Sequence, residues 1–547
     1  MLADEIKEIL YGYVRRESIS HSPGEKEAET YFLDFFGKQE YFQAHPGYYG
    51  AFPIEEDPFD RAAVWAMVKG EGSDTVVLIH HYDVVTVEDF KTLKAYAFTP
   101  DELEKRLWEI KDSFSDEARE DLESGEWMFG RGVCDMKGGG SIQMALLSEY
   151  ARQKEFQGNV IVLGVPDEEN LSAGMRAGVI LLDKLKQEYG LEYKLMINSE
   201  PHQRKTKEEG VFSFGSIGKL MPFVYVRGCL AHAGKVFEGL NPVNIMCEIV
   251  RNTEVNMEFS DVVGNEAAPP PTWLYLRENK LSYDVSMPLT INGCLSVLTL
   301  NQSPKSVMAK LRKICEDSFE TVIADMNRNY RRFAQAAGRP QTELPWKSRV
   351  VDFGELVREA EKNYGEEFKA AYEAELENLY EKIQKGEESL IMANFSLVDF
   401  VYDYIDDLSP RVVIGLVPPY YPNVANVLSR EENEKTAGLF DRLNGFVRER
   451  WRQNYIREDF YTGISDLSYS GISNGSEIED SLKSGMPFLG KIYSLPISEI
   501  QNISMPCVNI GPWGKDFHKL TERVFKEDLY ERTPEILNFA IREMLRG

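Results

Sequence analysis

Cysteine is scarce in this chain and is nowhere arranged for pairing. The 547 residues include six cysteines, all far apart, and none of them belongs to a CxxC pair. Zinc ribbons and thiol redox motifs both need such pairs, so the sequence excludes them. We therefore expect a reduced, cytoplasmic protein without a disulfide framework.

Long apolar runs are also missing. No stretch of about 18 apolar residues occurs, so we expect no membrane-spanning helix. The first ten residues, MLADEIKEIL, are amphipathic and acidic, and they lack the apolar centre of a signal peptide.

Basic residues are outnumbered by acidic ones. Lys and Arg total 62 against 89 Asp and Glu, which gives a formal net charge of -27. Nucleic-acid binding requires clustered cations, so we expect no nucleic-acid partner. Apolar residues make up 43% of the chain, which is enough to build a core, and 547 residues predict two domains.

Apolar runs that alternate with helical patterns predict an α/β fold with a mixed, mainly parallel sheet sandwiched by helices. The continuous run TVVLIH is typical of a central parallel strand. A charged, helix-like insert occupies residues 101–124. The predicted strands are Ala63–Lys69, Thr75–His80, Asn159–Val165, Tyr193–Ile197 and Pro506–Ile510.

The pattern changes between residues 214 and 429. Ser216–Arg227 and Leu289–Leu300 read as antiparallel strands separated by a helix at Pro242–Asn256, and long polar helices follow. LVPPYYP at 416–422 reads as a loop, and a helix at Glu431–Arg452 restores the α/β pattern. We therefore predict one α/β domain formed by residues 1–213 and 430–547, interrupted by an inserted α+β domain at 214–429.

His81 and Asp83 lie at the end of the strand TVVLIH. Side chains two apart on a strand point to the same side, and open α/β sheets bind ligands at the carboxyl ends of their strands. A metal-bound imidazole usually donates its other N–H to a carboxylate, which suits His81 as a ligand and Asp83 as its partner. A hydrogen bond without metal stays open, and His80, expected on the opposite side, is the alternative ligand.

Asp135 lies in the glycine-rich segment WMFGRGVCDMKGGG, before a helix expected from Ser141. A dinucleotide-binding turn fails because its third glycine would fall on Asp135. A P-loop fails because Lys137 has neither the right spacing nor a following Ser or Thr. The turn is either tight packing or the support of a metal-binding carboxylate.

Further acidic and imidazole groups follow other predicted strands. Adjacent buried carboxylates repel each other unless a cation separates their roles, so that one is a ligand and the other a base. These placements at strand ends together predict one metal site. The groups are Glu168 and Glu169, Glu200, and His518 with Glu522 four residues on.

In order and approximate spacing, these motifs resemble the clan of co-catalytic zinc hydrolases that includes aminoacylase, glutamate carboxypeptidase, acetylornithine deacetylase and succinyl-diaminopimelate desuccinylase. Length and motif wording further resemble an arginine-utilisation branch of that clan. The motifs are HxD at 81–83, GRGxxDMKGG at 130–139, EE at 168–169, SEP at 199–201, GISD at 463–466 and HxxxE at 518–522.

The resemblance implies two divalent metal ions, expected to be zinc, with cobalt or manganese as alternatives. His81 and Glu200 would be the terminal ligands of one ion. Glu169 and His518 would serve the other, and Asp135 would bridge both.

The resemblance also implies catalytic and substrate-binding roles. Glu168 would act as general base and then as general acid, and Asp83 would orient His81. In the segment VRGCLAHAGKVFEGLNPV, His232 would stabilise the oxyanion and Asn241 would contact a substrate carboxylate.

Three structural expectations accompany the resemblance. The bond between Asp135 and Met136 is expected to be cis. Tyr82 and His80 replace small residues of the family pattern, so we expect them to narrow the rim of the site. The inserted domain at 214–429 resembles the family's lid or dimerisation domain but is about twice its ordinary size, which suits either a monomer or a homodimer, while residues 1–213 and 430–547 would form the catalytic domain.

The predicted function is that of a dinuclear zinc amidohydrolase or metallopeptidase. Its substrate would be an N-acyl amino acid or a small peptide with a free carboxylate, and arginine utilisation suggests a derivative of arginine or ornithine. Two other interpretations stay open, namely an inactive scaffold that serves as a binding protein and an aminopeptidase with one metal ion.

Overall fold

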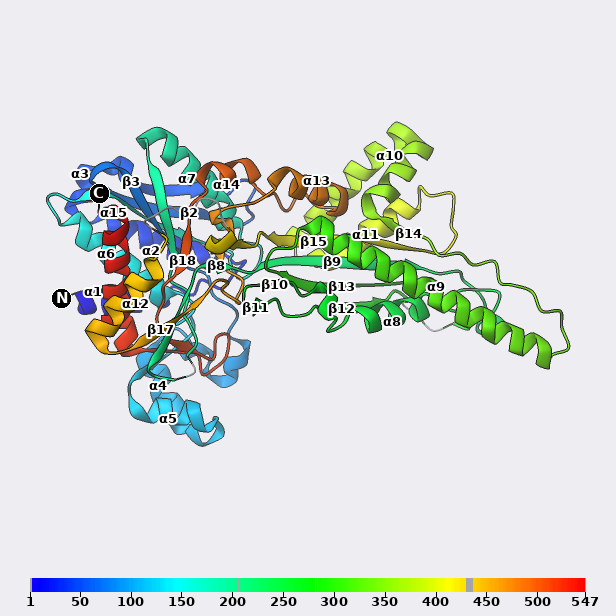
Figure 1. The fold of residues 1–547 in the computed structure, drawn as a ribbon, viewed down its shortest axis with the longest axis horizontal. Coiled ribbons are helices and arrows are strands. Elements are labelled where there is room, and N and C mark those ends of the chain that lie inside the picture. Colours follow the sequence, from blue (N-terminus) through cyan, green and yellow to red (C-terminus); the bar gives the residue numbers. More distant parts are fainter. Residues whose placement is uncertain (1, 205, 281, 283, 429–435, 547) are drawn as a thin grey trace. The chain divides into compact units, whose positions relative to one another are not determined.

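The computed structural model describes residues 2–204, 206–280, 282, 284–428 and 436–546. The chain divides into two compact units, each described by itself (Figure 1). Unit 1 comprises Met1–Ile217, Pro422–Ser473 and Leu495–Gly547, and unit 2 comprises Gly218–Tyr421 and Asn474–Ser494.

Unit 1 is built on an eight-stranded sheet in the order β1-β2-β5-β3-β6-β18-β7-β17. β3 pairs in parallel with both β5 and β6, and β18 pairs in parallel with β6. At one edge, β2 pairs antiparallel with both β1 and β5. The mixed, mainly parallel sheet is thus confirmed. The strands are β1 (Tyr49–Pro53), β2 (Ala62–Lys69), β3 (Glu71–His81), β5 (Gln157–Val165), β6 (Glu192–Asn198), β7 (Glu209–Ser213), β17 (Asn454–Glu458) and β18 (Cys507–Asn509).

Helices cover both faces of this sheet because its central strands are apolar on both sides. Val162 of β5 belongs to the core cluster shared with α1, α6 and α15, whereas the adjacent Leu163 packs towards Gly178 of α7. The helices of unit 1 are α1 (Leu2–Val14), α2 (Glu25–Gly37), α3 (Glu40–Ala44), α4 (Pro100–Glu109), α5 (Asp116–Ser124), α6 (Lys137–Ala151), α7 (Ala173–Tyr189), α12 (Leu439–Trp451), α14 (Ile497–Ile503) and α15 (Thr533–Leu545). The first part of the helix predicted at Glu431–Arg452 lies outside the described residues, and α12 covers its second part.

A small three-stranded sheet joins two distant parts of unit 1. Its order is β19-β20-β4, and both pairings are antiparallel. β4 leads into the turn of Asp135, and the hairpin between β19 and β20 carries His518. The bounds are β4 (Trp127–Phe129), β19 (Gly514–Lys515) and β20 (Arg523–Phe525). A further short pair consists of β8 (Gly215–Ser216) and β16 (Val424–Ala425).

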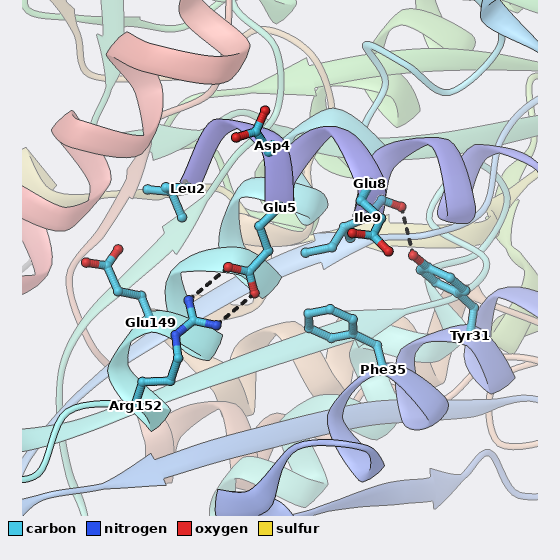
Figure 2. A pocket seen from close by; sticks show the side chains of 9 residues that line it. All are labelled: Leu2, Asp4, Glu5, Glu8, Ile9, Tyr31, Phe35, Glu149 and Arg152. Carbon is cyan, nitrogen blue, oxygen red and sulfur yellow. Dashed lines mark hydrogen bonds and ion pairs between the residues drawn. The ribbon is translucent and has the colours of Figure 1, made fainter.

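Residues of α1 and α2, with Glu149 and Arg152 at the end of α6, line an open pocket of about 760 Å³ (Figure 2). Its lining mixes acidic with apolar side chains, and Glu5 forms an ion pair with Arg152 at 2.8 Å. No residue of the predicted metal site lines this pocket. Among the described residues, no helix is both long enough and apolar enough to cross a membrane.

Unit 2 contains a five-stranded sheet in the order β12-β13-β9-β15-β14. α10 and α11 share one core cluster with the sheet, and α8 and α9 pack together and against it. The strands are β9 (Gly218–Arg227), β10 (Val262–Val263), β11 (Glu266–Ala267), β12 (Thr272–Glu278), β13 (Thr290–Thr299), β14 (Val350–Asp352) and β15 (Arg411–Tyr421). The helices are α8 (Pro242–Thr253), α9 (Pro304–Ala336), α10 (Phe353–Gln384), α11 (Leu390–Tyr402) and α13 (Gly475–Gly485).

Two details of unit 2 differ from the sequence analysis. LVPPYYP is not a loop, because β15 runs through it to Tyr421 with a shift of register after Val417. Asn474–Ser494, which we had assigned to the catalytic domain, belongs to unit 2 because α13 packs on α9, α10 and β15.

Candidate metal centre

The parallel register of β3 with its two neighbours brings three strand ends together. His81, the last residue of β3, is paired with Val165 at the end of β5, and Ile79 is paired with Asn198 at the end of β6. Side chains that follow these strands therefore converge on one edge of the sheet, where open α/β sheets bind ligands.

The first group of potential ligands is formed by His81, Asp135 and Glu200. His81 Nε2 lies 3.1 Å from Asp135 Oδ1 and 3.4 Å from Glu200 Oε1. All three ligand atoms lie within 4.8 Å of one another. His81 and Glu200 are buried, so the group is shielded from water.

The second group uses the other oxygen of the same carboxylate. His518 Nε2 lies 3.2 Å from Asp135 Oδ2 and 2.9 Å from Glu169 Oε1. His518 is the exposed member, with 49% of its side chain accessible to solvent. Asp135 therefore faces one imidazole with each oxygen, as a carboxylate that bridges two cations would.

Asp83 contacts both His81 and the Glu168–Glu169 backbone. His81 Nδ1 lies 3.0 Å from the Asp83 carbonyl oxygen, which can only accept, so Nδ1 carries hydrogen and Nε2 is directed to the carboxylates. The Asp83 carboxylate accepts the backbone N–H of Glu168 at 3.1 Å and that of Glu169 at 3.2 Å. The buried Asp83 thus holds the His81 imidazole and the backbone of both Glu168 and Glu169 in place.

The turn of Asp135 is held by Glu522, which is not one of the five predicted metal ligands. Glu522 Oε1 accepts the backbone N–H of Gly132 at 2.7 Å and those of Cys134 and Asp135 at 3.4 Å. Glu522 Oε2 pairs with the buried guanidinium of Arg131 at 2.5 Å. The HxxxE spacing in the sequence singled out Glu522 but did not indicate that it binds the Asp135 turn and Arg131.

The bond between Asp135 and Met136 is cis, as predicted. α6 begins at Lys137, four residues before the expected start at Ser141. A Cβ on Gly140 would lie 2.5 Å from the His80 ring, so only glycine allows this close approach of α6 to β3.

The expected narrowing of the rim by Tyr82 and His80 is wrong. Both side chains are buried in the core. The Tyr82 hydroxyl donates to the carbonyl of Ala62, and the His80 ring lies within hydrogen-bonding distance of Gln143 and Tyr13. His80 therefore packs on the opposite side, as predicted, and cannot replace His81 as a ligand.

The carboxylates of the site repel one another. Burial raises the pKa of Glu168 well above its usual range, and it raises that of Glu200 to about 7. Burial also acts on Asp135, but hydrogen bonds from His518 and His81 outweigh it and hold the pKa of that carboxyl well below its usual range. Hydrogen bonds to the Asp135 and Glu169 carboxylates raise the pKa of His518 to about 10.

These observations fit divalent cations. Imidazole nitrogens and carboxylate oxygens are the donors that zinc accepts in catalytic sites. Two positive ions would offset both the burial and the mutual repulsion that raise the carboxyl pKa values at this edge. Asp466 of the GISD segment belongs to the same charged surroundings, since burial raises its pKa to about 7 and His81 acts against that rise.

The two remaining predicted site residues, His232 and Asn241, lie in unit 2. His232 is exposed, and its Nδ1 accepts the backbone N–H of Gly234 at 3.0 Å. In the neutral ring Nε2 must therefore carry the hydrogen, which makes it a donor. Asn241 Oδ1 accepts the N–H of Val243 at the start of α8.

Comparison with known proteins shows the family of this chain. Residues 78–535 match the model of Peptidase family M20/M25/M40. Protein YqjN of Bacillus subtilis (strain 168) is 31% identical over 546 residues, which cover 99% of this chain and 97% of YqjN. Protein RocB of the same organism is 26% identical over 555 residues and is covered to 96%.

Solved structures share the fold. Aminopeptidase PepT from Bacillus cereus ATCC 10987 has a TM-score of 0.55 at 12% identity, with 100% of this chain and 99% of that chain covered. The M20 family metallo-carboxypeptidase Sso-CP2 from Sulfolobus solfataricus has a TM-score of 0.53 at 12% identity, with 99% and 100% covered. The family match spans most of the chain and includes every predicted site residue, so this chain belongs to Peptidase family M20/M25/M40 and is a hydrolase of amide bonds.

Proposed function

We propose that the protein is a dinuclear, zinc-dependent amidohydrolase that cleaves an N-acyl amino acid or a small peptide beside a free carboxylate. The position of Asp135 carries this proposal. Its Oδ1 lies 3.1 Å from the His81 imidazole and its Oδ2 lies 3.2 Å from that of His518. Glu200 would complete one ligand set and Glu169 the other.

Two bound cations would acidify a water molecule and polarise the scissile carbonyl. Glu168 forms a third close group with His81 and Glu169, and its Oε2 is 4.0 Å from His81 Nε2, but the two ligand sets proposed above do not use it. Burial raises its pKa, so this carboxylate is suited to take a proton from water and then give it to the leaving amine. Asp83 would keep Glu168 in place through the backbone N–H.

Unit 2 would supply two groups to the substrate. His232 presents Nε2–H as a donor, because its Nδ1 is occupied by Gly234, and it would stabilise the oxyanion. Asn241 uses Oδ1 to cap α8, and its carboxamide nitrogen is the group that would donate to a substrate carboxylate. Both groups would come from the same chain in a monomer or from a second copy in a homodimer.

Similarity over the full length to RocB, together with the arginine-utilisation motifs, favours a derivative of arginine or ornithine as substrate. A panel of N-acyl arginines, N-acyl ornithines, neutral N-acyl amino acids and dipeptides therefore tests the substrate class.

The decisive experiment compares wild type with Glu168→Gln after loading with zinc, manganese or cobalt. We expect wild type to hydrolyse members of the panel and the variant to be slower by about 100-fold or more, with the metal content unchanged. Equal rates would contradict the role of Glu168. A wild type that binds the compounds without hydrolysing any of them would indicate a binding protein instead.

A further inference from the structure

The helical insert at residues 101–124 contacts the hairpin that carries His518. Asp121 of α5 accepts two ion pairs from the base of that hairpin. Its Oδ2 lies 2.7 Å from Lys515 Nζ and 2.8 Å from Arg523 Nε. Glu117, one turn earlier on α5, adds a second carboxylate 2.8 Å from Lys515 Nζ.

The hairpin needs these carboxylates because of its own charges. Lys515 of β19 is the direct cross-strand partner of Arg523 of β20, and like charges in such positions repel. Only 1% of the Arg523 side chain and 16% of the Lys515 side chain are exposed, so water screens the repulsion poorly. Asp121, itself 13% exposed, contacts both cations through one oxygen and offsets their repulsion.

Aromatic rings close the other side of this cluster. Lys515 Nζ lies 4.5 Å from the ring centroid of Trp127 and 4.9 Å from that of Trp513. Trp127 begins β4, the strand that leads into the turn of Asp135. Lys515 therefore lies between the carboxylates of α5 and the rings of Trp127 and Trp513.

The same arginine reaches into the loop of the hairpin. Arg523 donates to Asp516 and to the carbonyl of Thr521, and the Thr521 hydroxyl donates to Asp516 at 2.8 Å. Asp516 and His518 have φ angles of 54° and 63°, a left-handed conformation that is uncommon for residues other than glycine. The path from Asp121 through Arg523 to Asp516 thus fixes a loop that does not hold its shape by backbone preference alone.

We propose that the insert is a clamp for the His518 hairpin and that Asp121 is its positioning residue. His518 has half of its side chain in solvent, whereas its companions Asp135 and Glu169 are nearly buried. The position of the imidazole therefore depends on the hairpin. The inference rests on the proposed metal roles, and it assigns to α5 control over the affinity of the ion held by Asp135, Glu169 and His518.

The test compares Asp121→Asn with Glu123→Gln in the full-length protein. Glu123 lies on the same helix, and its carboxylate pairs with Lys111 instead of the hairpin. Metal-free protein is titrated with Zn²⁺ against a chelating dye, and amide hydrogen exchange is measured across residues 516–522. In Asp121→Asn we expect one of the two zinc constants to weaken about 10-fold, the other to stay unchanged, and exchange in the loop to accelerate. Glu123→Gln should match wild type in both measurements.

Unchanged exchange and unchanged zinc constants in Asp121→Asn would overturn the clamp. Equal weakening of both constants would also overturn it, because a general loss of structure would then explain the effect. A wild type that binds fewer than two zinc ions would overturn the proposed function, whereas the exchange measurement would still decide whether α5 holds the hairpin. Arg523→Met, which removes the guanidinium between Asp121 and Asp516, should weaken the same zinc constant and provides the test if Asp121→Asn does not fold.

Discussion

The carboxylate of Asp83 accepts a hydrogen bond from the backbone N–H of Glu168 at 3.1 Å. The same residue accepts from His81 Nδ1 through its carbonyl oxygen. Asp83, which follows β3, therefore couples a proposed ligand of one metal to the proposed base, through its carbonyl oxygen and its carboxylate. The HxD and EE motifs of the sequence are therefore in direct contact in the fold, although 85 residues separate Asp83 from Glu168.

Asp83→Asn should disturb the ligand and the base together, because the Asp83 carboxylate also lies 3.6 Å from His81 Nδ1. The amide has one acceptor oxygen instead of two, and its NH2 group would face the backbone N–H of Glu168 or Glu169. We expect zinc affinity to fall about 10- to 100-fold, as is typical for partners of metal ligands, with a parallel fall in kcat. Metal titration and steady-state kinetics measure both effects.

Asp74→Asn is the matched control for that variant. Asp74 lies at the other end of β3, where it pairs with Lys194 at 3.1 Å. It should leave zinc affinity and kcat unchanged. Equal effects of the two substitutions would mean that Asp83 serves the strand and not the site.

The stability of the metal-free protein should fall as pH rises. Folding raises the pKa of Glu200 from 4.5 to about 7, chiefly through burial, and that of His518 from 6.5 to about 10 through its hydrogen bonds to Asp135 and Glu169. Both groups bind protons more tightly in the folded state, so their contribution is complete at low pH and is lost as pH rises through the raised values. Bound zinc takes the place of these protons, so the gain in Tm on adding zinc should grow between about pH 5 and pH 9.

Thermal unfolding with chelator and with zinc, followed over that range, measures this linkage. His518→Ala should reduce the part of the fall that occurs above pH 6.5, because the alanine has no proton to lose, whereas Glu168 and Glu200 keep theirs. A metal-free Tm that rises with pH would contradict the assignment of these groups to one repelling cluster.

His232→Ala should separate turnover from metal binding. The neutral imidazole presents Nε2–H, and the loss of one such donor to an oxyanion costs about 100-fold in kcat. Elemental analysis should find the same metal content in the variant and in wild type. A loss of metal that parallels the loss of activity would contradict a role for His232 towards the substrate.

The sequence predicted the strands and the residues at their ends because both follow from local patterns. A continuous apolar run marks β3, and polar groups at its end must face either solvent or a ligand. His81, Glu168 and Glu200 were therefore found one by one, and parallel pairing brings them together without further assumptions.

Contacts between distant segments could not be predicted in this way. The hydrogen bond from the Asp135 N–H to Glu522 spans 387 positions, and no local pattern indicates which backbone groups a distant carboxylate accepts. For LVPPYYP, a local pattern was present but predicted a loop where the structure has a strand. Proline punctuates loops in general, yet β15 tolerates two prolines because its register shifts there.

The central claim is that Asp135 bridges two metal ions. Anomalous diffraction from zinc-loaded crystals tests it most directly, because it locates the ions without reference to the protein geometry. The account predicts two peaks about 3.5–4 Å apart, one beside His81 and Glu200, the other beside Glu169 and His518, with one oxygen of Asp135 directed to each. A single peak, or two peaks of which neither lies beside Asp135, would contradict it.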